Sequence, residues 1–425
     1  MARGIEWRRE TPAAPAALTP WGRRREVRRA HEADAERVAE LLRRWRATCY
    51  TAGLAEDTES CAGIPGAAFP EVRSVVLGSD SDRLMVETIP GQVAKDYQAQ
   101  AHRIAAGMGV PRVRIRQRGG SLPGYLIVEL LRVDPLAQPV MLPAGARLAE
   151  HPVLMLGCET GEDLRVSLLD SMHIICQGQT RSGKTRWVYG LLAQLCGCVD
   201  VRICGSDITG LVARAFAGTR HEDGWATGSN YIEAHAEALE AVVAEMDRRN
   251  ALMPPRVDVY PVSEAEPLLF VVVEELAGLV EAAAAADAVR TRPSRGMPAT
   301  PKLADRIKGA LKRLMAEGGK VGIRVLLLVQ RAEAGIIGGF ARAQASLRLS
   351  FRVDDAESVR MLHPLVDPVL ALEHATAEPA IALVSGPGLS LTRGRAPHMP
   401  DYATYVDLVQ QRSGPAVTRS FDVAA

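Results

Sequence analysis

The segment that most constrains the fold is the eight-residue stretch GQTRSGKT at residues 178–185. It fits the pattern G-x-x-x-x-G-K-[S/T], in which glycines let successive backbone N–H groups turn inward around the phosphates of a nucleotide. The run HIICQG before it is typical of a buried strand, and an amphipathic helical pattern begins at Thr185. A strand, a glycine-rich loop and a helix in this order predict a phosphate-binding loop in a parallel α/β domain.

The lysine in this loop is itself informative, because only six of the 51 basic residues of the chain are lysines. Lysine is a compact point charge on a thin stem, whereas arginine is a wide planar fork. We therefore expect Lys184 to reach the β- and γ-phosphates and the Thr185 hydroxyl to ligate Mg²⁺. The candidate nucleotide-binding residues are Gly178, Gln179, Thr180, Arg181, Ser182, Gly183, Lys184 and Thr185.

Two later strand ends carry polar residues that suit the same chemistry. The run PLLFVVVEEL ends in Glu274 and Glu275, and in P-loop folds the neighbouring strand ends in an acid that helps to hold Mg²⁺. Glu275 is the candidate general base, and Glu274 is a second metal ligand beside Thr185, although aspartate is usual there. Gln330 ends the run VLLLVQ, where it either senses the γ-phosphate or belongs to a turn.

The pattern around the loop, from 146 to 400, alternates apolar strands with helices, which is typical of an α/β domain with a parallel sheet. We expect helices from Thr185, over 232–246 and over 303–315, and a mobile loop in the low-complexity stretch 281–301. The expected strands are HIICQG, VRICGSD, LLFVVVEEL, GIRVLLLVQ and SLRLSFRV.

The remaining chain divides into three parts. Residues 1–60 are expected to form a basic arm with an amphipathic helix. The first 49 residues hold twelve arginines against seven acids. Such a surplus of positive charge is compatible with binding to phosphate backbones or to an anionic membrane, and also with a solvated tail that binds neither. Residues 61–145 mix short strands with one helical run, predicting a small α+β module that ends in a linker from 134. Residues 401–425 are expected to form a C-terminal tail.

Composition limits where the protein works. No apolar run approaches the ~20 residues that a membrane-spanning helix needs. The seven cysteines show no paired CxxC spacing, which indicates a reduced protein. We therefore expect a cytoplasmic protein without a transmembrane segment of its own, recruited to a membrane, if at all, by a membrane-protein partner.

Taken together, these motifs resemble the motor domain of the FtsK/SpoIIIE family of DNA translocases. The stretch ALEAVVAEMDRRNALM (238–253) is similar to the family's helix with an EMxRRxxxM signature. The stretches 328–363 and 380–397 resemble its later motifs and closing hairpin, and 88–115 resembles the subdomain beside the motor. The likeness covers about 70–400 and is greatest to the Tra-type conjugative pumps of actinomycete mobile elements. It implies a RecA-like P-loop NTPase with ATP and Mg²⁺ as ligands.

The resemblance also implies a hexameric homo-oligomer with double-stranded DNA in its pore and ATP between subunits. An arginine from the neighbouring subunit then stabilises the γ-phosphoryl group. Arg360 and Arg348 are the candidates, and each has the alternative of an ion pair within its own subunit, with acids in 354–357.

Contact with DNA should be mostly to phosphate, because a pump cannot depend on sequence. The helix at 303–315 is also explained as an ordinary amphipathic surface helix, with Leu303, Ile307, Leu311 and Leu314 facing the core; both interpretations can hold at once. The candidate basic residues are Arg290, Arg292, Arg295, Lys302, Arg306, Lys308, Lys312 and Arg313.

The function expected from this resemblance is ATP-driven translocation of double-stranded DNA in conjugative or mobile-element transfer. Two alternatives stay open at the level of sequence. A type VII-like protein-secretion ATPase shares the motor fold, and fold does not determine cargo. An ATP-binding regulatory or assembly factor with weak hydrolysis is suggested by Glu274, which replaces the usual aspartate.

Overall fold

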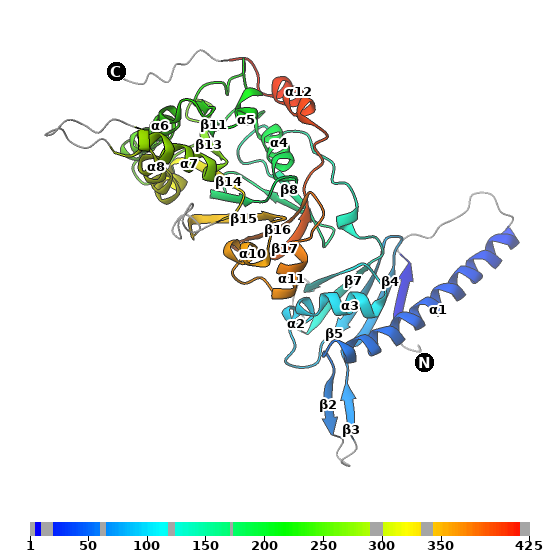
Figure 1. The fold of residues 1–425 in the computed structure, drawn as a ribbon. Coiled ribbons are helices and arrows are strands. Elements are labelled where there is room, and N and C mark those ends of the chain that lie inside the picture. The colour runs from blue at the N-terminus through cyan, green and yellow to red at the C-terminus, as the bar shows by residue number, and fades with distance from the viewer. Residues whose placement is uncertain are drawn as a thin grey trace. The chain divides into compact units, whose positions relative to one another are not determined.

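The chain divides into two units, residues 1–138 and 139–425, each built around a sheet of its own (Figure 1). The division falls inside the stretch 134–145, where Pro135–Ala137 forms a short 3-10 helix, η1. The computed structural model describes residues 5–9, 20–59, 65–117, 124–170, 173–289, 301–332 and 343–416.

The first unit contains a five-stranded sheet in the order β1-β4-β5-β7-β6. Its strands are antiparallel except that β1 pairs with β4 in parallel, and β2 and β3 form a separate hairpin. The strands are β1 (Glu6–Arg9), β2 (Glu56–Glu59), β3 (Pro65–Ala68), β4 (Glu71–Leu77), β5 (Ser81–Glu87), β6 (Arg112–Gln117) and β7 (Tyr125–Leu131).

Three helices pack on the apolar face of this sheet: α1 (Pro20–Thr51), α2 (Ala94–Ala99) and α3 (Ala101–Met108). Trp45 of α1 is fully buried, and its indole N–H donates to the carbonyl of Pro70 at 2.9 Å. The sequence assigns this helix to a basic arm, yet its apolar stripe is part of the core of the first unit. The domain boundary at residue 60 therefore stays a proposal.

The second unit contains a ten-stranded sheet in the order β12-β11-β13-β14-β10-β15-β16-β17-β8-β9. The six strands from β12 to β15 are parallel, and the others join antiparallel. Parallel strands are covered on both faces, which explains their continuous apolar runs. The strands are β8 (Val153–Cys158), β9 (Asp163–Val166), β10 (His173–Gln177), β11 (Val201–Asp207), β12 (Trp225–Thr227), β13 (Leu268–Glu274), β14 (Ile323–Val329), β15 (Ala345–Phe351), β16 (Ile381–Gly386) and β17 (Leu389–Arg395).

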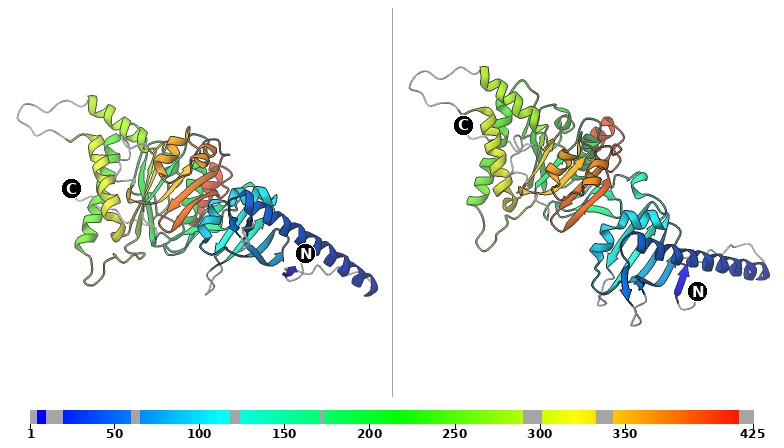
Figure 2. Two further views of the ribbon diagram at one scale, coloured as in Figure 1. Left: turned by 90° about the horizontal axis from the view of Figure 1, so that it is seen from below. Right: turned by 60° about the horizontal axis from the view of Figure 1, so that its bottom comes forward.

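Helices cover both faces of this sheet. On one face α4 (Lys184–Leu195) packs against α12 (Tyr402–Arg412), with the rings of Tyr189 and Tyr405 stacked at 4.3 Å. On the other face, α6, α7 and α8 form a layer (Figure 2). These and the remaining helices are α5 (Leu211–Arg214), α6 (Ile232–Ala251), α7 (Leu276–Val289), α8 (Leu303–Glu317), η2 (Gly318–Val321), α10 (Ala356–Leu362) and α11 (Pro368–His374).

The mixed α/β architecture with a large, mostly parallel sheet confirms the predicted fold class. One element differs from expectation, because residues 281–289 belong to α7 and the prediction of a loop is wrong there. Alanine is the strongest helix former, and Leu276, Leu279 and Ala283 are buried against the sheet. The rest of that stretch, 290–300, lies outside the described residues. Helix α12 likewise packs into the core, although the sequence assigns 401–425 to a tail.

The strand order also differs from expectation. The acidic strand β13 is not the neighbour of the phosphate-loop strand β10, because β14 lies between them. Strand order is decided by where each crossover helix packs, which local sequence patterns do not record. As a result, the prediction of an acidic strand holds, but the prediction that this strand lies next to the phosphate-loop strand is wrong.

No helix among the described residues has both the length and the apolar character to cross a bilayer. Six of the seven cysteines lie in the described part of the chain, and all six are buried and free. Burial raises the pKa of thiols such as Cys176 and Cys204 to about 12, so these side chains behave as small apolar groups.

Candidate functional site

The phosphate loop joins the end of β10 to the start of α4, and close packing explains its glycines. Gly183 has a φ of 103°, and a Cβ there would lie 2.6 Å from the backbone nitrogen of Ala380. A Cβ at Gly178 would lie 2.7 Å from Ser182 Oγ. The N–H of Ala380 donates to the carbonyl of Ser182 at 2.8 Å, so the residues before β16 hold the loop from one side. Residues 178–185 thus form one continuous loop and first helical turn.

Two further contacts hold this loop against the ends of neighbouring strands. The N–H of Gly178 donates to the carbonyl of Val329, the last residue of β14, at 3.2 Å. The Gln179 amide, in the orientation that satisfies both neighbours, accepts from Arg352 Nε and donates to Asp354. The loop is therefore fixed by β14 and by the residues after β15.

Lys184 is buried, with 8% of its surface exposed, and its charge is held at the carboxyl ends of the central strands. Its Nζ donates to the carbonyl of Val329 at 2.9 Å and lies 3.6 Å from Glu275 Oε2. Thr185 is exposed in the first turn of α4. The start of a helix attracts anions, so lysine, helix and loop together suit a phosphate group.

The two glutamates at the end of β13 have different environments. Glu275 has a φ of 51°, uncommon for any residue but glycine, and its carboxylate faces Lys184. Glu274 is largely buried. Burial, strengthened by the charges of Asp207 and Glu275, raises the pKa of Glu274 to about 7. One acid thus contacts the lysine and the other is poised to exchange a proton near neutral pH.

A third acid, Asp207, belongs to this cluster and is absent from the residues predicted above. It is fully buried at the end of β11, in register with Glu274 across the β11–β13 pair. The Thr209 hydroxyl donates to Asp207 Oδ1 at 2.8 Å. An apolar run ending in an acid, VRICGSD, is the signal that would have found it. Its carboxylate accepts backbone N–H groups from Thr209, Gly210, Val212 and Ala213.

The site can hold a nucleoside triphosphate with Mg²⁺. Two of its buried polar atoms, Ser182 Oγ and Glu274 Oε2, have no hydrogen-bond partner within the described part of the chain. Mg²⁺ is usually bound by one or two protein oxygens, and waters and substrate phosphates complete its coordination. Thr185 and Glu274 can supply the protein oxygens. Among the described residues no group of three His, Cys, Asp or Glu side chains could hold a metal by itself.

Two further predicted site residues, Gln330 and Arg360, are both exposed. Gln330 is exposed directly after Val329, whose carbonyl accepts from Lys184. Arg360 is exposed on α10. Asp355, one of the acids considered as its partner, accepts from Arg331 at 3.3 Å instead. The roles of Gln330 and Arg360 stay predictions.

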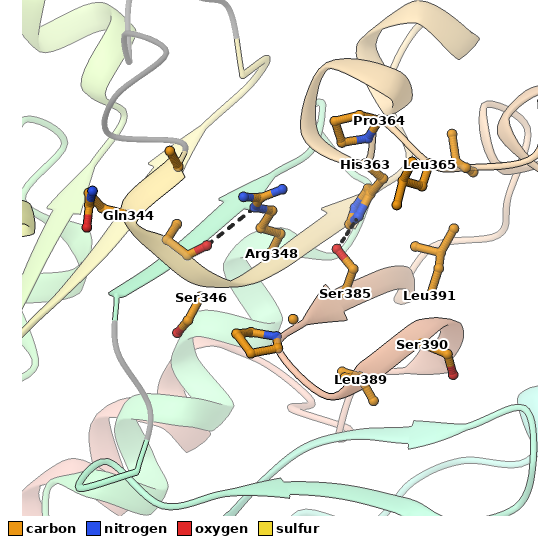
Figure 3. A pocket seen from close by; sticks show the side chains of 15 residues that line it. Gln344, Ser346, Arg348, His363, Pro364, Leu365, Ser385, Leu389, Ser390 and Leu391 are labelled. Carbon is orange, nitrogen blue, oxygen red and sulfur yellow. Dashed lines mark hydrogen bonds between the residues drawn. The ribbon is translucent and has the colours of Figure 1, made fainter.

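Arg348 lies in a different environment (Figure 3). It is half-buried in the middle of β15, in register with Ile175, three residues before the phosphate loop. Its Nε donates to the carbonyl of Ala345 at 3.3 Å, and its side chain lines a cavity together with His363 and Ser385.

The basic residues proposed for DNA contact divide into three groups. Arg290, Arg292 and Arg295 lie outside the described residues. Arg306 donates to Glu240 at 2.6 Å and to Glu233 at 3.0 Å, and Arg313 is paired in the same way with Asp247 and Glu317. Lys302, Lys308 and Lys312 are exposed. The four apolar residues of α8 are buried as predicted: Leu303, Ile307, Leu311 and Leu314.

No family model matches the sequence, and no curated protein matches it. The structure is similar to that of the pCW3 conjugation coupling protein TcpA in a monomer form with ATPγS, with a TM-score of 0.50 and 17% identity over 88% of this chain and 99% of that one. The chain has a P-loop ATPase fold. The similarity is one of architecture, because the sequence identity is low.

Two other solved structures are similar with lower scores. The cytoplasmic domain of the type VII secretion ATPase EccC from Thermomonospora curvata has a TM-score of 0.49 and 19% identity over 68% of this chain and 33% of that one. The genome packaging NTPase B204 of Sulfolobus turreted icosahedral virus 2, in complex with AMPPCP, has a TM-score of 0.33 and 14% identity over 54% of this chain and 99% of that one. The fold assignment rests on TcpA and on the topology described above.

Proposed function

We propose that this chain is an ATPase that translocates double-stranded DNA as a ring-shaped, hexameric motor of FtsK/SpoIIIE type, in conjugative or mobile-element transfer. The observation that carries the proposal is the position of Lys184, buried between the Val329 carbonyl and Glu275 beside the acid Glu274. The similarity in fold to a conjugation coupling protein solved with ATPγS supports a nucleotide at this loop.

The residues of the site have complementary roles in this proposal. When ATP binds, Lys184 leaves Glu275 for the β- and γ-phosphates, which releases the carboxylate to accept a proton from the attacking water. Thr185 and Glu274 would hold Mg²⁺, which would supply charge stabilisation at the phosphates. Gln330 directly follows β14, whose last carbonyl accepts from Lys184, and in this proposal its amide would report loss of the γ-phosphate through a hydrogen bond.

The neighbouring subunit completes the site in this proposal. An arginine supplied in trans contributes about 10³–10⁵ in rate in other NTPases. Arg360 suits that role better than Arg348, because Arg360 is exposed on α10, whereas Arg348 lines a cavity within its own subunit.

The experiment that tests the proposal measures ATP hydrolysis with and without duplex DNA, for the wild type and for Lys184→Ala. We expect strong stimulation by DNA in the wild type and none in the variant. An ATP hydrolysis rate that does not change when duplex DNA is added would favour the alternative of a protein-secretion ATPase. No hydrolysis under any condition would favour a regulatory ATP-binding factor.

A further inference from the structure

A buried glutamine stands immediately before the phosphate loop and has no role in the site described above. Gln177 is the last residue of β10 and is fully buried, and Gly178 begins the loop. Burying an amide costs free energy unless its polar atoms are hydrogen-bonded, and an apolar residue would fill the same space without that cost. The reason for an amide at this position therefore lies in the groups that it contacts.

The amide of Gln177 joins three segments that adjoin β10. Its Nε2 donates to Ser350 Oγ on β15 at 2.7 Å and to the carbonyl of Ser358 on α10 at 2.9 Å. Its Oε1 accepts from the N–H of Ala332, after the end of β14, at 3.0 Å. Both donor hydrogens and the acceptor oxygen are thus used, and all three partner residues are themselves buried.

Two of these segments carry residues of the proposed mechanism. Ser358 lies two residues before Arg360 on α10, and Ala332 lies two residues after Gln330. The N–H of Ser358 donates to the N-cap carboxylate of Asp355 at 2.7 Å. The part of α10 that Gln177 holds is therefore its capped first turn, directly before the exposed arginine.

The end of β14 connects this amide to the lysine of the phosphate loop. The carbonyl of Val329 accepts from Lys184 Nζ at 2.9 Å and from the N–H of Gly178 at 3.2 Å. In the proposed function Lys184 leaves this carbonyl when ATP binds, so the end of β14 loses one of its two donors. Hydrogen bonds act over a narrow range of distance and angle. A displacement of residues 329–332 is therefore passed through the amide of Gln177 to α10.

We propose that Gln177 is a positioning residue that couples nucleotide binding at the phosphate loop to the placement of Arg360. The inference rests on the proposed function, in which Arg360 acts on the nucleotide of the neighbouring subunit, and adds to it a route from one nucleotide to the next. Gln177 takes no part in the chemistry. Without its amide the loop still binds ATP, but α10 is no longer held where hydrolysis in the neighbour requires it.

The test replaces the amide with an apolar side chain of similar length, in Gln177→Met. The matched control is Gln194→Met, at a second buried glutamine near the end of α4. The Nε2 of Gln194 donates to the carbonyls of Leu154 and Gly190, and its Oε1 accepts from the N–H of Leu154. Each variant loses three buried hydrogen bonds, so the melting temperatures should fall by similar amounts. Gln177→Met alone loses the contact with α10.

The first measurement is steady-state ATP hydrolysis by the full chain with duplex DNA, beside equilibrium binding of ATPγS. Gln177→Met should lower kcat by about 10²-fold, as a small displacement of a catalytic group does, and should keep the wild-type affinity for ATPγS. Gln194→Met should keep both values. The double variant Gln177→Met/Arg360→Ala should be no slower than Arg360→Ala, because an arginine that is absent cannot be misplaced.

The second measurement does not depend on hydrolysis. Amide hydrogen exchange is followed in peptides that cover residues 356–362, without nucleotide and with saturating ATPγS and Mg²⁺. In the wild type and in Gln194→Met, ATPγS should slow exchange in α10 severalfold. In Gln177→Met, ATPγS should bind and leave that exchange unchanged. If Gln177→Met does not fold, Gln177→Asn takes its place with Gln194→Asn as its control, because the shorter amide cannot span the same three partners.

Four results would overturn the inference. They are wild-type kcat and exchange in Gln177→Met, equal losses of kcat in the two methionine variants, multiplied losses in the double variant, and exchange in α10 that does not respond to ATPγS in the wild type. A wild type that fails to bind ATPγS gives the last of these results. A wild type in which ATPγS protects α10 through Gln177, but which hydrolyses no ATP, would count against the proposed function alone.

Discussion

At the scale of single residues, the sequence predicts the loop around Lys184 and the acids Glu274 and Glu275, because each lies at the end of an apolar strand. The same reasoning would have found Asp207, which ends the run VRICGSD. It could not have shown that Lys184 donates to the Val329 carbonyl, because residues 145 positions apart meet only through the strand order. Nor does it distinguish Arg348 from Arg360, since exposure is a tertiary property.

Glu275→Gln should leave ATP binding intact and lower the rate of hydrolysis by at least about 10²-fold, as removal of a general base does. The amide keeps the size of the side chain but accepts no proton. The measurement is steady-state phosphate release beside equilibrium binding of ATPγS. A variant that hydrolyses ATP at the wild-type rate would remove Glu275 from the mechanism.

Glu274 should make the stability of the nucleotide-free protein depend on pH. Burial raises the pKa of Glu274 from 4.5 to about 7, so the folded chain keeps a proton that the unfolded chain releases in this range. The free energy of unfolding should therefore fall as pH rises from about 4.5 to 7, by about 1–3 kcal/mol from this group.

Glu274→Gln tests this directly, because an amide does not titrate. Chemical denaturation between pH 5 and pH 8 should show a flatter profile for the variant, whereas Glu237→Gln, at an exposed position on α6, should keep the wild-type profile. Parallel profiles for wild type and Glu274→Gln would contradict the assigned environment of this side chain.

At the scale of elements, periodicity predicts the parallel strands and the helices α4, α6 and α8. It fails at 281–289, where a run of alanines is a helix covered by its neighbours and not a loop. Strand β14 could be predicted as an element, but its insertion between β10 and β13 depends on where crossover helices pack. Helix α8 combines both kinds of information, since its apolar stripe is buried while Arg306 and Arg313 are held by acids.

The exposed lysines at the start of α8 and along it should contribute to DNA affinity. Replacing Lys302, Lys308 and Lys312 with Gln should weaken binding to duplex DNA, and should lower the slope of log affinity against log salt by about one for each phosphate that the protein no longer neutralises. Fluorescence anisotropy with labelled duplex at several salt concentrations measures both. An unchanged slope would exclude α8 from the DNA-binding surface.

Arg306→Ala should instead act on the fold. Its guanidinium bridges α8 to Glu240 and Glu233 of α6 and is only partly exposed, so its removal should lower the free energy of unfolding by about 1 kcal/mol. Denaturant titration checks this value. A larger effect on DNA affinity than on the free energy of unfolding would contradict the structural role of Arg306 and assign it to DNA binding with the lysines of α8.

At the scale of the whole molecule, the proposal requires several copies of the chain around one duplex. Mass measurement by light scattering should show a small species with ATPγS alone and a much larger one when duplex DNA is added. Arg360→Ala should still assemble but should hydrolyse ATP about 10³-fold more slowly, because the arginine acts on the neighbour's nucleotide. Normal hydrolysis by that variant would contradict its action in trans.

The proposed function depends most on the binding of a nucleoside triphosphate through contact between Lys184 and its phosphates. The direct measurement is titration calorimetry of the nucleotide-free protein with ATPγS and Mg²⁺, for the wild type and Lys184→Ala. We expect one molecule bound per chain in the wild type, and an affinity at least about tenfold lower in the variant, which cannot make a charge-assisted hydrogen bond to phosphate. If the wild type shows no magnesium-dependent binding of ATPγS, with or without duplex DNA, the proposal of an ATP-driven motor is contradicted and only the fold assignment remains.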